Sequence, residues 1–179
     1  MKKAQSRGLL WLIVALVGCV LVSVVGLLHR ELVELPASAR ADRIVVIKHE
    51  HAMMLMRDGQ VLKTYRVALG RGGIGPKVHA GDNRVPEGVY LIAGRNARST
   101  FHRALRVGYP TPQQVRAGRS MGVDPGGDIM IHGIRNGLGW VGSLQRYVDW
   151  TKGCVAVTDG EIEEIWRVVP DGTVIEIRP

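Results

Sequence analysis

Cysteine and aromatic residues are scarce in this chain of 179 residues, and both scarcities narrow the class of protein. There are two cysteines, Cys19 and Cys154, and Cys19 lies in an apolar N-terminal run, so the remainder of the chain holds one thiol and cannot form an internal disulfide. Aromatic residues make up only 5%, whereas glycine accounts for 23 residues. This composition favours many turns and short strands over a helical bundle.

Charged residues are absent from Leu9 to Leu28, a run of 20 residues. As a helix with a rise of about 1.5 Å per residue, this run would cross the core of a bilayer. Basic residues precede it, which predicts a cytoplasmic N-terminus (Lys2, Lys3, Arg7). We therefore expect residues 1–30 to be a cytoplasmic tip and a single transmembrane helix, residues 31–42 a linker, and residues 43–179 an exported domain in the periplasm or another extracytoplasmic space.

Two other interpretations of the N-terminus stay open. Ala37, Ser38 and Ala39 have the small-x-small form of a signal-peptidase site, although this site lies far beyond the apolar run. Residues 16–19 resemble a lipoprotein lipobox, yet apolar residues continue after Cys19. An anchor, a cleaved signal and a lipoprotein signal would all export the domain.

The excess of positive charge is modest outside the N-terminus. The chain has a net charge of +8, but four of its 24 basic residues and none of its 16 acidic residues lie within residues 1–30, which leaves +4. No run of lysines and arginines with interleaved aromatics is present, so we expect no nucleic-acid partner. A weakly basic surface suits an anionic polymer such as a cell wall, and it equally suits an ordinary solvated surface.

Alternating apolar residues and turn signals predict a mainly β domain. Strands are expected at residues 43–48, 52–57, 60–69, 89–93, 105–107, 128–132 and 173–177, with a hairpin turn at Asp58 and Gly59. Helices are expected at 112–121, within 138–150, and after Thr158, where Glu161 completes a capping box. His49, Glu50 and His51 are metal-ligand residue types, but neighbouring strand positions diverge, so no metal site is predicted.

His132 and Cys154 are the candidate catalytic couple. Alternation along their strands would place each reactive side chain opposite aliphatic residues that bury the strand (Ile129, Ile131, Val155, Val157). A solitary thiol in an oxidising compartment is a liability unless it has a chemical task. A neighbouring imidazolium would lower the thiol pKa, and the backbone N–H of Cys154, with that of Gly153 or Lys152, would hold an oxyanion.

At these residues the sequence resembles the exported L,D-transpeptidase (YkuD-type) domain. The shared signature is His132 and Gly133, then a loop, then Thr151 to Cys154; residues 81–88 resemble a further turn of the family. The resemblance implies a YkuD-like β-sandwich with one or two short helices, no metal and no cofactor. It also implies that Cys154 is the nucleophile, that His132 is the general base and acid, and that the Gly133 carbonyl orients the imidazole.

The same resemblance implies action on peptidoglycan stem peptides, at a bond from an L-centre to a D-centre. Typical members carry Arg or Asn where this chain has Ala156, and the loop from His132 to Cys154 is longer than usual. These departures resemble a proteobacterial subgroup of transpeptidases and hydrolases. The acceptor could therefore be a second stem peptide, a wall-attached lipoprotein or water, and a non-catalytic wall-binding module is a third alternative. Three cations are candidates for holding substrate carboxylates (Arg135, Arg146, Lys152).

Overall fold

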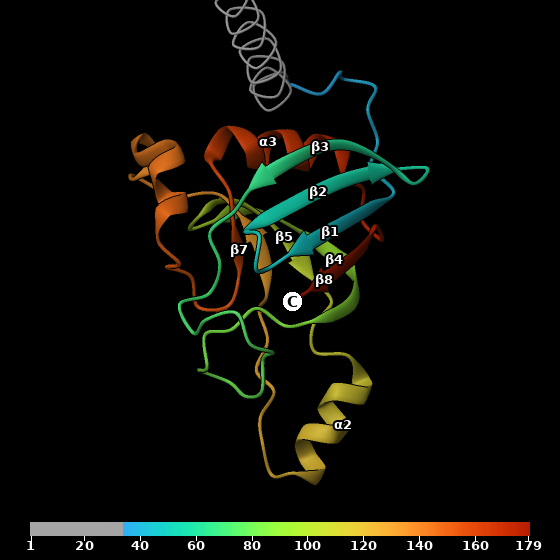
Figure 1. Ribbon diagram of the computed structural model, residues 1–179, viewed down its shortest axis with the longest axis vertical. Coiled ribbons are helices and arrows are strands. Elements are labelled where there is room, and N and C mark those ends of the chain that lie inside the picture. The colour runs from blue at the N-terminus through green and yellow to red at the C-terminus, as the bar shows by residue number, and fades with distance from the viewer. Residues whose placement is uncertain (1–33) are drawn as a thin grey trace, which may run out of the picture. The chain divides into compact units, whose positions relative to one another are not determined.

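One continuous β-sheet organises residues 34–179, the part of the chain that the computed structural model describes (Figure 1). The transmembrane helix expected at Leu9 to Leu28 lies outside these residues. Eight strands form the sheet in the order β3-β2-β1-β8-β4-β5-β6-β7. They are β1 (Arg43–Ile47), β2 (Ala52–Arg57), β3 (Gln60–Arg66), β4 (Gly88–Ser99), β5 (His102–Val107), β6 (Met130–His132), β7 (Val155–Ala156) and β8 (Val174–Arg178). The prediction of a mainly β domain is confirmed.

The hairpin of β2 and β3 forms as its turn residues predict. Asp58 and Gly59 have φ angles of 50° and 77°, and two successive positive φ values match the twist of the flanking strands. β1 pairs antiparallel with β2 and parallel with β8, so the last strand of the chain lies inside the sheet.

The two ends of the sheet meet beside the Cys154 segment. β4 is 12 residues long and pairs with β8 near its start and with β5 further along, with a register shift between Ile92 and Gly94. The chain that continues beyond β3 then forms bridges from Ala68 to Ala156 and from Gly70 to Thr151. The expected sandwich is therefore one sheet that returns upon itself, and the strand next to the nucleophile has no free edge.

Three short helices lie within the described residues, at the three places that the sequence pattern predicts, whereas the family resemblance implied one or two. They are α2 (Pro112–Ser120), the 3₁₀ helix η1 (Gly139–Tyr147) and α3 (Asp159–Val168). α3 has the predicted capping box, with Thr158 accepting from Glu161 N–H and the Glu161 side chain accepting from Thr158 N–H. In Figure 1, α3 runs along the sheet at the top of the view, and α2 lies below the sheet.

The hydrophobic core lies between the curved sheet and α3. Residues from both are fully buried, including Ile44, Leu55, Leu105, Ile131, Ile162 and Ile165. Each such side chain contributes about 1.5–3 kcal/mol of transfer free energy. Ile129, Ile131, Val155 and Val157 are all buried, as the alternation predicts.

Part of the segment expected as a linker is attached to α3. The backbone N–H of Leu35 donates to the Glu164 carboxylate, and Arg167 donates to the carbonyls of Leu35 and Pro36. Ala41 is buried. Among residues 34–179 there is no helix both long enough and apolar enough to span a bilayer.

Candidate active site

A cavity of about 930 Å³ has both His132 and Cys154 in its wall. His132 ends β6, and Cys154 immediately precedes β7, the parallel neighbour of β6. Register pairs His132 with Ala156, and Val157 N–H donates to the His132 carbonyl at 3.0 Å. Strand pairing therefore brings together two residues that are 22 positions apart in the sequence.

The His132 ring is held in one orientation and one tautomer. Its Nδ1 lies 2.7 Å from the Gly133 carbonyl oxygen. Because a carbonyl oxygen only accepts, Nδ1 must carry the hydrogen, and the neutral ring keeps Nε2 free of a proton as an acceptor. This contact is the one expected for Gly133.

Two aromatic side chains enclose the His132 ring. The Phe101 ring lies 4.5 Å from it between centroids, and the Trp150 ring lies 5.6 Å away in an edge-on arrangement. Phe101 stands at the tip of the β4–β5 hairpin, and β5 pairs with β6, which places this tip beside His132. His132 is only 3% exposed, and burial lowers the pKa of its imidazole despite the hydrogen bond to Gly133.

Thr151 fixes the loop that presents Cys154. Its hydroxyl donates to the Cys154 carbonyl at 2.7 Å and accepts from the Gly153 N–H at 3.2 Å. Gly153 has a φ of 115°, and a Cβ there would lie 2.8 Å from the Arg84 carbonyl oxygen, so only glycine fits. The Gly153 N–H thus donates to Thr151 in this structure, and its expected donation to an oxyanion stays a prediction.

The surroundings of Cys154 favour the protonated thiol. Its Sγ lies 3.5 Å from the Asp128 carbonyl oxygen, to which it donates. Burial raises the thiol pKa; the Met130 N–H and Lys77 lower it in part, and the Asp128 carboxylate adds to the rise. With the imidazole pKa lowered as well, both shifts favour the neutral forms of the couple, and the thiolate–imidazolium pair expected from the sequence stays a prediction.

The two strands at the site are shorter than the sequence predicts. The strand expected at residues 128–132 begins only at Met130, because Asp128 has a φ of 54°. Cys154 lies just before β7 and not within it. Asp128, Met130, His132 and Cys154 nevertheless all line the cavity, as alternation with the buried aliphatic residues implies.

Asp159 positions the Gly133 segment from α3. Its Oδ1 accepts from the Ile134 N–H at 2.8 Å, and a Cβ added to Gly133 would lie 2.7 Å from the same oxygen. Gly133 N–H in turn donates to the Arg103 carbonyl. The carbonyl that orients His132 is thus held by close packing against a helix N-terminus.

Of the three cations expected to hold substrate, the structure brings two to the cavity. Arg135 and Lys152 line it together with the catalytic couple. Arg146 does not line it, because its guanidinium is paired with Glu161 in the first turn of α3. The Arg146 side chain therefore fastens η1 to α3.

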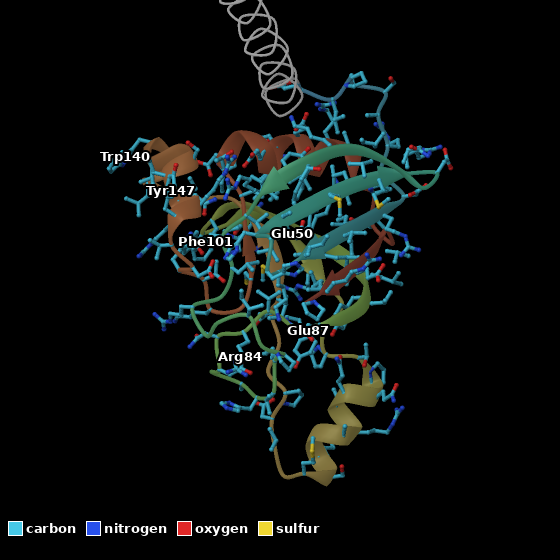
Figure 2. All side chains as sticks on the ribbon, viewed as in Figure 1. Glu50, Arg84, Glu87, Phe101, Trp140 and Tyr147 are labelled. Atoms are coloured by element: carbon cyan, nitrogen blue, oxygen red, sulfur yellow. The ribbon has the colours of Figure 1, made fainter. Side chains whose placement is uncertain are left out.

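Sequence reasoning missed Phe101, Gln145 and Trp150, all of which line the cavity. Phe101 is the one phenylalanine of the chain, but the pattern around it indicates only a turn. Gln145 is the buried residue of η1, whereas Trp140 and Tyr147 of the same helix are 81% and 84% exposed and project outward (Figure 2). The one available signal was the adjacency of Trp150 to the Thr151–Cys154 motif.

A thiol and a carbonyl-anchored imidazole lie in one cavity of a mainly β fold, and these are the residue types that nucleophilic catalysis by cysteine uses. A family model for the L,D-transpeptidase catalytic domain (YkuD) matches residues 41–177. The chain belongs to this family. The Escherichia coli (strain K12) protein YafK, whose name assigns it provisionally to the L,D-transpeptidases, is 30% identical over 112 residues, which cover 62% of this chain and 38% of YafK.

Solved structures share the fold. The helical cell shape determining protein Pgp2 of Campylobacter jejuni aligns with a TM-score of 0.59 and 21% identity, over 78% of this chain and 48% of Pgp2. Bd1075 of Bdellovibrio bacteriovorus aligns with a TM-score of 0.53 and 21% identity, over 81% of this chain and 50% of Bd1075. An L,D-transpeptidase of Xylanimonas cellulosilytica gives 0.51 and 17%, over 79% and 62%. The chain thus spans about half of Pgp2 and less of YafK.

Proposed function

We propose that this chain is a peptidoglycan L,D-transpeptidase that works through a thioester on Cys154. The observation that carries the proposal is the His132 ring, whose Nδ1 is committed to the Gly133 carbonyl, in a cavity that also holds the Cys154 thiol. This arrangement leaves Nε2 as a base for the thiol proton. Family membership supports acyl transfer on wall peptides as the reaction.

In the proposed reaction, His132 Nε2 takes the Sγ proton as Sγ attacks the carbonyl carbon of the L-to-D bond in a tetrapeptide stem. The oxyanion takes hydrogen bonds from backbone N–H groups, and because Thr151 occupies that of Gly153, those of Cys154 and Lys152 are the candidates. The imidazolium returns its proton to the departing amine of D-alanine, which leaves a thioester. An acceptor amine then gives its proton to His132 and displaces Cys154.

Arg135 and Lys152 are proposed to bind the substrate. Both line the cavity, where Asp128 is the acidic residue of the wall. A stem peptide carries free carboxylates, and guanidinium and ammonium groups recognise these by charge-assisted hydrogen bonds. These two residues would therefore fix the donor strand relative to Cys154.

The setting of the reaction is also a proposal. The uncharged run from Leu9 to Leu28 would hold the domain on the outer side of the cytoplasmic membrane, in the periplasm. The acceptor would be a second stem peptide, or a lysine of a wall-attached lipoprotein. The structural similarity to Pgp2, which is named for helical cell shape, makes cell shape a phenotype to examine.

The test is a product analysis with the full-length chain in detergent micelles and purified disaccharide-tetrapeptide. Mass spectrometry should show cross-linked dimers and released D-alanine. Trimmed monomers without dimers would instead identify a hydrolase, in which water resolves the thioester.

The chain offers a matched control, because the same Cys→Ala change can be made at its other cysteine. Cys154→Ala should abolish all products, and Cys19→Ala should leave them at the wild-type level. If the products are the same for Cys154→Ala as for the wild type, the thioester mechanism is wrong.

A further inference from the structure

Gln145 is a buried amide in an otherwise exposed stretch. It is 7% exposed, whereas its neighbours in η1, Leu144 and Tyr147, are 64% and 84% exposed. A buried amide is costly unless both of its ends have hydrogen-bond partners. The burial of Gln145 therefore requires hydrogen-bond partners for both its oxygen and its nitrogen.

Both ends of the Gln145 amide are engaged, and both partners belong to the catalytic centre. Its Oε1 accepts from the indole Nε1–H of Trp150 at 2.9 Å. Its Nε2 donates to the Ala156 carbonyl at 3.4 Å, and Ala156 is the register partner of His132. The side chain thus joins the strand beside His132 to the indole whose edge faces the His132 ring at 5.6 Å.

We infer that Gln145 is a positioning residue for the general base: it holds Trp150 edge-on to His132, so that the ring stays in place and out of contact with water. Gly133 fixes the imidazole at Nδ1, Phe101 packs on one side of the ring, and Trp150 closes another. This inference rests on the proposed function, and it names a further residue on which that function depends.

Gln145 and Trp150 both belong to the long loop between His132 and Cys154, so this loop supports the general base. Without the Gln145 acceptor, the indole N–H of Trp150 would be left unsatisfied beside the cavity, and the indole would turn toward water to hydrogen-bond. That movement would open His132 to water and free its orientation. An interaction of this kind contributes about 0.5–1.5 kcal/mol, which corresponds to a rate effect of up to about ten-fold.

The test is a double-mutant cycle in the full-length chain with Gln145→Met and Trp150→Phe. Gln145→Met keeps the length of the side chain without its hydrogen bonds, and Trp150→Phe removes the indole N–H but keeps an aromatic ring. Each should lower kcat up to about ten-fold with little change in KM, because positioning of the base acts on the chemical step. The double variant should be no worse than the more affected single variant.

A second readout does not depend on turnover. The His132 ring should titrate by NMR below the ordinary histidine pKa of about 6.5 in the wild type, and toward that value in both single variants. The other charged or titratable groups of the cavity wall are Arg98, Asp128, Arg135, Lys152 and Cys154, and burial raises the pKa of the Cys154 thiol. His132→Ala identifies the signal, and Gln113→Met, the same change at an exposed glutamine, is the matched control.

The outcomes are distinct. Additive losses of kcat, or a His132 titration that does not move in either single variant, would overturn the positioning role. A wild-type chain without transfer or hydrolysis products would refute the proposed function, whereas the NMR titration would still decide whether Gln145 and Trp150 control the environment of His132.

Discussion

Gly133→Ala tests whether close packing against α3 holds the carbonyl that orients His132. The φ of Gly133 lies outside the left-handed region, so an alanine backbone is unstrained and the cost comes from contacts alone. The new Cβ would lie 2.7 Å from Asp159 Oδ1, 3.0 Å from Ile162 Cγ2 and 3.1 Å from His102 Cβ. Asp159 Oδ1 cannot retreat without breaking its hydrogen bond to the Ile134 N–H.

The expected cost follows from these contacts. Inserting a methyl group into a packed site costs about 1–3 kcal/mol. For a domain of this size, a loss of about 2 kcal/mol lowers the melting temperature by roughly 4–8 °C. If Gly133 moves by about 1 Å to relieve the contacts, its carbonyl misaligns His132 and kcat falls by about 10²-fold. Circular dichroism melts and the dimer-formation assay, run well below the melting temperature, measure the two effects separately.

Gly160→Ala is the matched control. Gly160 lies in the first turn of α3, and a Cβ there meets no atom within 4 Å. Alanine at an unstrained helical position should raise stability by up to about 1 kcal/mol and leave turnover unchanged. Should Gly133→Ala melt and turn over like Gly160→Ala, the proposed packing of Gly133 against α3 would be wrong.

Three further predictions follow from the charges of the described residues. Because burial raises the pKa of Cys154 above the ordinary thiol value of about 8.5, the rate at which iodoacetamide labels Cys154, followed peptide by peptide, should keep rising above pH 8.5. A plateau of this rate near pH 6–7 would instead indicate a thiolate–imidazolium pair. Burial alone would raise the pKa of the Glu164 carboxyl, but Lys63, the Leu35 N–H and Tyr65 hold it below its ordinary value, so its contribution to stability is present above the unfolded pKa of about 4.3 and is lost as the pH falls through the folded value. Glu164→Gln should flatten the decrease in the free energy of unfolding, measured with urea, from pH 5 to pH 2. An unchanged slope would contradict this. Because Arg135 lines the cavity, Arg135→Ala should raise KM about ten-fold. Because Arg146 is paired with Glu161, Arg146→Ala should lower the melting temperature and leave KM near the wild-type value, and the reverse pattern would refute these two roles.

The sequence was a good guide wherever a local rule determines the outcome. Alternation predicted the burial of Ile131 and Val155, and the two positive φ values at Asp58 and Gly59 match the predicted hairpin. The capping box at Thr158 and Glu161 correctly marked the start of α3. Each of these features depends on residues only a few positions apart.

The remaining features depend on contacts between distant segments, which periodicity cannot show. Phe101 reaches His132 because β5 pairs with β6, and Trp150 does so because Thr151 is bridged to Gly70. In the sequence, Arg146 and Arg135 were equal candidates for binding substrate, but in the structure Arg146 forms an ion pair with Glu161. The directions in which the pKa values of His132 and Cys154 shift could not be predicted either, because burial is a property of the whole fold.

Ala156, where the family resemblance implied Arg or Asn, depends on the same long-range packing. Its side chain is fully buried, and its carbonyl accepts from Ala68 N–H and from Gln145 Nε2. The side-chain amide that contacts Ala156 therefore comes from the loop between His132 and Cys154.

The position of β8 inside the sheet has a consequence for the exposed edges of that sheet. β8 pairs with β1 on one side and with β4 on the other. Without residues 174–178, β1 and β4 would each present a row of unpaired backbone groups, which is a template for pairing with another chain. β8 therefore protects the two central strands from association, and the bridges of Ala68 and Gly70 to the Cys154 segment do the same at the ends of the sheet.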